Sequence, residues 1–173
     1  MKVTVPAEGP LLGLDVGRRW VGLAVSDPLQ VVASGAGVID RQAGGWLARV
    51  GEVARRHRVV GVVVGLPRRT DGSLGPEASR VQKLAARLEA SLGLPLVFWD
   101  ERLTTRQAEQ ALLEGGLRRE RRRELVDQAA AVLILQGFLE AQRARRRAGA
   151  APPAGMDGGR QEDLAPGDPN SIL

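Results

Sequence analysis

The stretch LLGLDVGRRWVGLAVSDP, residues 11–28, predicts two β-strands joined by a turn. Within residues 20–26 large and small side chains alternate, which is typical of a strand with one bulky and one small face: Val21, Leu23 and Val25 against Gly22, Ala24 and Ser26. Since Gly17 separates the two apolar segments, we expect residues 11–26 to form a hairpin. Asp15 ends the first strand, where an ionised carboxylate is unfavourable unless a cation meets it.

The rest of the chain predicts an α/β fold. The continuous apolar run at 59–67 is typical of a strand covered on both faces, and an amphipathic helix at 44–58 precedes it. Further strands are expected at 31–39 and 95–101. Further helices are expected at 76–92 with Gly93 as a stop, at 104–116 with a capping box of Thr104 and Gln107, and at 120–147. The order β-β-β-α-β-α-β-α-α indicates a mixed sheet flanked by helices.

Length and charge indicate one basic domain. We expect a single domain over residues 1–147 and a Pro/Gly-rich, acidic, disordered tail over 148–173. The net charge of +5 is uneven, because the tail carries one Arg against four acids. The first 147 residues hold 24 basic against 16 acidic residues. That surplus favours nucleic acid binding, although an Arg-rich chain that is also rich in Ala and Gly is what a GC-biased genome produces.

The residue types exclude several classes of site. The chain has no Cys, so disulfides, thiolate nucleophiles and zinc–cysteine clusters are excluded. Its lone His57 lies among arginines at the end of a predicted helix, and we interpret it as structural. The phosphate-loop and dinucleotide-binding fingerprints are absent. No signal peptide or run of ~18 apolar residues is found, so we expect a cytoplasmic protein with no membrane partner.

Three acidic positions stand out because of their apolar surroundings. Asp15 ends one strand, Asp100 and Glu101 end another, and Asp127 precedes the apolar helical stretch QAAAVLIL. Alternation along residues 96–101 places Asp100 and Glu101 on opposite faces of the sheet, so only one of them can share a face with a given neighbour. Each acid also has a structural interpretation: Asp15 capping a turn, Glu101 pairing with Arg102 or Arg106, and Asp127 at the positive end of a helix dipole.

Taken together, these carboxylates indicate a divalent metal site. Mg²⁺ and Mn²⁺ prefer oxygen ligands, and two ions about 4 Å apart can activate a water and stabilise the leaving oxygen of a phosphodiester. The sequence therefore predicts that the cation beside Asp15 is a metal.

Four motifs, in this order and spacing, resemble the YqgF/RuvX family: LDVGRRWVGLAVSD, VVVGLPRRTDGSLGPEASRV, DERLTT and VDQAAAVLILQ. The resemblance covers roughly residues 11–141. It implies an RNase H-like fold with a five-stranded mixed sheet whose first three strands are antiparallel. It also implies a metal-dependent nuclease, linked to maturation of the 5′ end of 16S ribosomal RNA and similar to Holliday junction resolvases.

By position, the resemblance assigns catalysis and metal binding (Mg²⁺ or Mn²⁺, two ions) to Asp15, Glu101 and Asp127. Asp100 matches the first letter of the DER motif, but its opposite face makes it a less secure ligand. We predict nucleic acid contacts at Arg18, Arg19, Arg68, Arg69, Asp71 and Arg102. An ion pair is the alternative role for Arg102, and Trp20 either stacks on a base or packs in the core.

The expected substrate is a structured precursor of ribosomal RNA, and a branched DNA junction is the main alternative. Symmetric cleavage of a junction would require a homodimer. A sugar-kinase or actin-type ATPase shares the DxG opening, but it would need a second domain for which 173 residues leave little room. A non-catalytic nucleic-acid-binding module is the third class, and it should bind RNA without requiring metal.

Overall fold

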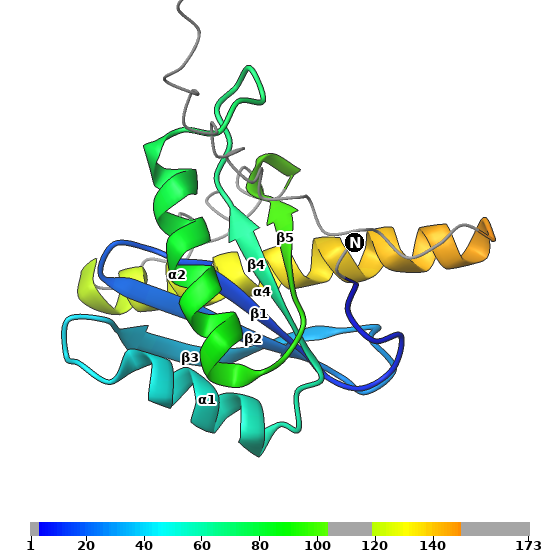
Figure 1. Cartoon of the computed structure of the whole chain (residues 1–173), viewed down its shortest axis with the longest axis horizontal. Coiled ribbons are helices and arrows are strands. Elements are labelled where there is room, and N and C mark those ends of the chain that lie inside the picture. Colours follow the sequence, from blue (N-terminus) through cyan, green and yellow to red (C-terminus); the bar gives the residue numbers. More distant parts are fainter. Residues whose placement is uncertain (1–3, 104–118, 150–173) are drawn as a thin grey trace, which may run out of the picture.

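The computed structural model describes residues 4–103 and 119–149, with the backbone alone for Leu103 and residues 119–124. Five strands form one sheet in the order β3-β2-β1-β4-β5 (Figure 1). They are β1 (Leu11–Val16), β2 (Trp20–Ser26), β3 (Ala33–Asp40), β4 (Gly61–Leu66) and β5 (Leu96–Asp100). β1, β2 and β3 pair antiparallel, whereas β4 is parallel to both β1 and β5. This arrangement confirms the expected mixed, RNase H-like sheet.

The hairpin predicted from residues 11–26 is present. Asp15 pairs with Gly22 and Val16 with Val21 across the ladder. The turn closes where the Gly17 amide donates to the Trp20 carbonyl at 2.9 Å. The strand end that carries Asp15 is therefore joined to β2 by only three residues.

Helices cover both faces of the sheet (Figure 1). The helices α1 (Trp46–Arg56) and α2 (Pro76–Leu92) lie on one face, over a core that includes Leu12, Leu14 and Val64. The long helix α4 (Arg119–Arg147) crosses the other face, over a second core that includes Leu11, Val63 and Val97. Successive residues of each strand thus alternate between two separate cores.

The small face of β2 allows α4 to approach closely. A Cβ atom on Gly22 would lie 1.9 Å from the Asp127 carbonyl oxygen, which is far inside van der Waals contact. A Cβ atom on Gly13 would also clash with α4, at 2.6 Å from the Leu135 Cβ, and one on Gly35 would meet the Gln128 side chain. The alternation of bulky and small residues therefore determines which face of the sheet receives α4.

Several expected boundaries shift slightly. The strand expected at 31–39 begins at Ala33, because Asp27 Oδ1 accepts hydrogen bonds from the Val31 and Val32 amides and holds them in a loop. As expected, α2 ends at Gly93, whose φ of 62° permits its amide to donate to the Glu89 carbonyl.

Two expectations lie outside the described residues: the capping box and helix at 104–116, and the tail from residue 150 onward. The helix expected at 120–147 is α4. Within the part of the chain that is described, no helix is both long enough and apolar enough to cross a membrane.

Candidate active site

Asp15 and Glu101 lie on the face of the sheet that α4 covers. Asp15 follows Leu11 and Gly13 on that face of β1, and it is half-buried. Glu101 opens η1 (Glu101–Leu103) directly after β5. Its Oε1 lies 2.6 Å from where a Cβ on Gly65 would be, beside the Ile134 side chain of α4. Glu101 therefore extends over β4 toward β1 rather than into solvent.

Asp127 reaches the same place from α4. Its backbone carbonyl packs against Gly22, and Gly22 is the cross-strand partner of Asp15. The close contact between α4 and β2 thus places Asp127 at the same position along the strands as Asp15.

The electrostatics of the three carboxyl groups are coupled. Burial, and then the charge of Asp127, raise the pKa of Asp15 to about 6, while the guanidinium of Arg80 acts in the opposite direction. Burial, and then the charges of Asp15 and Asp100, raise the pKa of Glu101 to about 7. Arg80 is thus one cation near Asp15, but its charge does not offset burial and the neighbouring acids.

The donor set suits Mg²⁺ or Mn²⁺, because these ions prefer carboxylate oxygens and would relieve the repulsion that raises both pKa values. Among the side chains that the structure describes, in residues 4–102 and 125–149, however, no group of three or more His, Cys, Asp and Glu forms a cluster that could hold a metal ion. The three acids therefore lie at one edge of the sheet, but their side chains do not form a complete metal-binding site.

Asp100 lies on the opposite face of the sheet, where its carboxylate forms ion pairs with two arginines. Arg102 donates from Nε and Nη2 to its carboxylate, at 3.0 and 2.6 Å to Oδ2, and Arg68 Nε lies 3.9 Å from Oδ2. Burial opposes ionisation, but the hydrogen bonds from Arg102 and the charges of both arginines hold the pKa of Asp100 below its usual value. Arg102 thus forms the ion pair that the sequence left as an alternative.

The loop after β4 lies next to this pair of arginines. Asp71 Oδ1 accepts a hydrogen bond from the Ser73 amide at 2.8 Å, and the Arg69 amide donates to the Ser73 carbonyl at 3.0 Å. Arg68 Nη1 donates to the Gly72 carbonyl at 3.1 Å. Hydrogen bonds from Ser73, with a smaller effect of the Arg102 charge, lower the pKa of Asp71. Asp71 therefore shapes the loop that surrounds Arg68 and Arg102.

The remaining predicted contact residues lie at the β1–β2 turn. The Arg18 side chain is 83% exposed and forms an ion pair with Glu77. Arg19 pairs with Asp40, and its guanidinium lies 4.8 Å from the centre of the Trp20 ring. Trp20 is half-buried and is not part of either core, and its stacking on a base stays a prediction.

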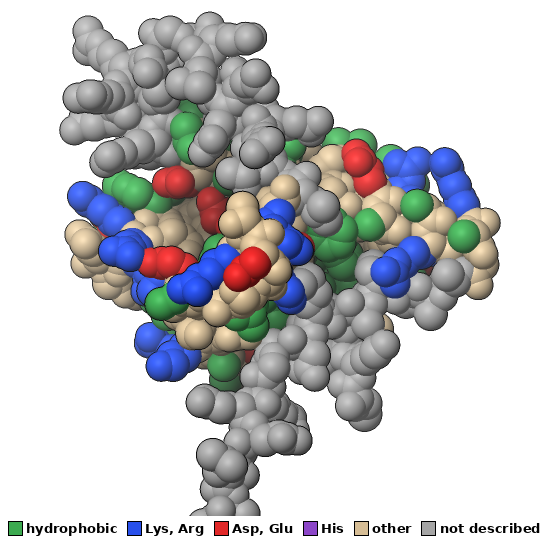
Figure 2. Space-filling model, turned by 90° about the horizontal axis from the view of Figure 1, so that it is seen from above, with side chains coloured by type: hydrophobic (Ala, Val, Ile, Leu, Met, Phe, Trp, Pro, Cys, Tyr) green, Lys and Arg blue, Asp and Glu red, His purple; other side chains and the backbone are tan. Residues whose placement is uncertain are grey.

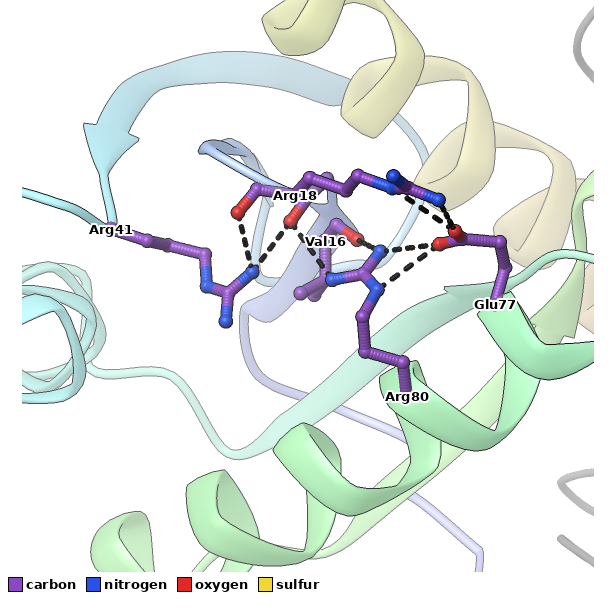
Figure 3. A network of polar contacts seen from close by, with 6 residues as sticks. Val16, Arg18, Arg41, Glu77 and Arg80 are labelled. Atoms are coloured by element: carbon purple, nitrogen blue, oxygen red, sulfur yellow. Dashed lines mark hydrogen bonds and ion pairs between the residues drawn. The ribbon is translucent and has the colours of Figure 1, made fainter.

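Arg41 and Arg80 are contacts that sequence reasoning missed. Both side chains donate to carbonyl groups of the β1–β2 turn (Figure 3). These arginines are 24 and 63 residues from Gly17 in the chain, and no spacing rule links such positions.

Figure 2, which looks down on the edge toward which β4 and β5 point, shows acidic and basic side chains interspersed there.

Comparisons with known proteins give a consistent result. The model of the RuvX family, described as Holliday junction resolvase, matches residues 9–141. A "Putative pre-16S rRNA nuclease" of Pelotomaculum thermopropionicum is 45% identical over 150 residues, which are 85% of this chain and 97% of that protein. A protein of the same name from Moorella thermoacetica is 50% identical over 75% of this chain and 94% of its own length.

A solved structure described as "T. thermophilus RuvC in complex with Holliday junction substrate" aligns with 84% of this chain and 99% of its own. The two sequences are 20% identical and the TM-score is 0.49.

Proposed function

Because this chain belongs to the RuvX family, we propose that it is a nuclease that hydrolyses phosphodiester bonds in precursors of 16S ribosomal RNA, at the 5′ end. One observation carries the proposal: Asp15, Glu101 and Asp127 come from β1, from directly after β5 and from α4, and Asp15 is close enough to both of the other acids for their charges to interact. The relatives named for pre-16S rRNA support RNA as the substrate.

The carboxylates that would hold Mg²⁺ or Mn²⁺ are those of Asp15, Glu101 and Asp127, whose side chains would have to draw closer around an ion than they lie in this structure. A divalent cation there supplies a Lewis acid that makes a water nucleophilic and stabilises the charge on the leaving oxygen. The chain itself supplies acceptor oxygens on fixed elements. The apolar surroundings of β1 and α4 exclude bulk water from them and strengthen their attraction for a cation.

Arg68 and Arg102 are the proposed contacts for substrate phosphates. They lie beside Asp100 at the end of β5, on the face of the sheet opposite Glu101. The Arg102 side chain is 41% exposed, so its guanidinium can contact a phosphate while Asp100 holds its Nε and Nη2. A guanidinium suits phosphate because its donors lie in one rigid plane. Arg18 and Arg19, at the β1–β2 turn, would extend the same positive path.

The test is cleavage of a 5′-labelled fragment of pre-16S rRNA with Mn²⁺ or Mg²⁺. We expect Asp15→Asn and Glu101→Gln to lower the rate about 100-fold or more, because each removes a charge that would hold the cation. Glu52→Gln is the matched control, since Glu52 lies exposed on α1 across the sheet from α4. Equal cleavage by all three variants would contradict the proposal.

A four-way DNA junction in the same assay tests the alternative substrate, which the description of the family model favours. Preferential cutting of the junction, together with a dimer in sedimentation, would replace RNA by branched DNA. Binding of RNA without metal and without cleavage would instead indicate the non-catalytic class.

A further inference from the structure

The turn between β1 and β2 is held by arginines from two other elements (Figure 3). Arg80 of α2 donates from Nη2 to the Val16 carbonyl at 3.2 Å and from Nη1 to the Gly17 carbonyl at 3.1 Å. Arg41, which follows β3, donates from Nη1 to the Gly17 and Arg18 carbonyls at 2.9 and 2.8 Å. All three carbonyl groups that follow Asp15 thus accept hydrogen bonds from guanidinium groups.

These contacts follow from the shortness of the turn. A three-residue connection directs its carbonyl oxygens away from the strand ladder, so their hydrogen bonds must come from elsewhere. A guanidinium carries five donors in one plane and can therefore bind two neighbouring carbonyls at once. Arg80 uses this geometry on Val16 and Gly17, the residues that come directly after Asp15.

Arg80 is itself held in place. Its Nε donates to Glu77 Oε2 at 3.0 Å, and the other oxygen of Glu77 binds Arg18. Arg41 lies 5.4 Å from the centre of the Trp46 ring at the start of α1. The turn is therefore connected to α1 and α2, on the face of the sheet away from α4.

Asp15 needs such support, because two acids approach it from the α4 face. Asp127 and Glu101 each repel it. The contacts of Arg80 add to the strand ladder and to the packing of Leu14 and Val16 in holding the strand end against that repulsion. Only one residue of β1 follows Asp15 before the turn.

We propose that Arg80 is a positioning residue: it binds the carbonyl groups of Val16 and Gly17 and so holds the end of β1 where Asp15 faces Asp127 and Glu101. The inference deepens the proposed nuclease function and rests on it for its kinetic consequence. Arg80 touches backbone atoms of the turn, and its effect on the reaction passes through Asp15.

The test uses the full chain with Arg80→Gln, Arg80→Lys and, as matched control, Lys83→Gln, which removes the charge of an exposed residue of the same helix. Glu77→Gln is a milder variant that loosens Arg80 without removing it. The first measurement, made without metal or substrate, is hydrogen exchange of the Gly17 amide, which donates to Trp20. We expect at least tenfold faster exchange in Arg80→Gln, a smaller increase in Glu77→Gln, and no change in Lys83→Gln.

The second measurement separates positioning from phosphate binding. With the RNA substrate, Arg80→Gln should lower kcat at least tenfold with KM within twofold of wild type. Arg80→Lys should recover only part of kcat, since one ammonium cannot bind both carbonyls in the same plane. Unchanged exchange at Gly17, or an increase in KM alone, would overturn the inference. If wild type cleaves neither nucleic acid, the proposed function fails, and the exchange measurement still decides whether Arg80 holds the turn.

Discussion

Replacing Asp15 by Asn should make the metal-free protein more stable at alkaline pH. Burial and Asp127 raise the pKa of Asp15 from 3.8 to about 6 in the folded chain. The folded state therefore binds more protons than the unfolded state between these two values, and wild-type stability falls as pH rises through them. A difference of about 2 pH units corresponds to about 3 kcal/mol, which is an upper limit for the gain, because an amide replaces a protonated acid imperfectly.

The assay is urea denaturation followed by tryptophan fluorescence, in EDTA, from pH 4 to pH 8. We expect Asp15→Asn to exceed wild type by about 1–3 kcal/mol at pH 8, and the difference to vanish near pH 4. Addition of Mn²⁺ at pH 8 should then stabilise wild type much more than the variant, because only wild type has an ionised carboxylate at position 15.

Asp40→Asn is a control of opposite sign. Although burial opposes it, hydrogen bonds from Gln42 and Arg19 lower the pKa of Asp40, so its loss should destabilise the protein at pH 8. A variant Asp15→Asn that is less stable than wild type by the same amount at every pH would refute the reasoning about Asp15.

Three further predictions concern the surroundings of the site. Gly22→Ala should cost about 3 kcal/mol in urea denaturation and reduce cleavage, because its Cβ would meet the α4 backbone, whereas Gly51→Ala inside α1 should stabilise by about 0.5–1 kcal/mol. Asp100→Asn should destabilise by about 1–3 kcal/mol and raise KM for RNA, since Arg102 loses its carboxylate partner. An unchanged KM in the cleavage assay would count against a phosphate role for Arg102. Calorimetric titration with Mn²⁺ should give affinity that rises from pH 6 to pH 8 in wild type, because the ion competes with a proton on Glu101, and Glu101→Gln should bind weakly with little dependence on pH.

Side-chain alternation made much of the site predictable from sequence. The alternation in β2 predicted one bulky and one small face, and α4 packs on the small face at Gly22. Period-two alternation also separated Asp100 from Glu101 before any coordinates, and the structure places them on the two opposite faces. Both inferences need only local backbone geometry, which explains their success.

Contacts between distant segments were not predictable in the same way. Nothing in the neighbourhood of Arg80 indicates that it binds carbonyl groups of residues 16 and 17, because backbone acceptors leave no signature in the sequence. The start of β3 was misplaced for a related reason: Val31 and Val32 favour a strand, but the Asp27 carboxylate competes successfully for their amides.

The separation of Asp100 and Glu101 onto opposite faces also determines which genetic changes β5 can accept. Point substitutions at Leu96 or Phe98 leave each acid on its own side of the sheet. Insertion or deletion of a single codon between Leu96 and Asp100 would exchange the faces of the two acids, so that Asp100 turns toward α4 and Glu101 toward Arg68, while Arg102 shifts with them. The net charge of the chain would not change, yet both the acidic group and the arginine pair would lose their partners. The number of residues in β5 therefore matters more for the placement of the two acids than the identity of most of its side chains.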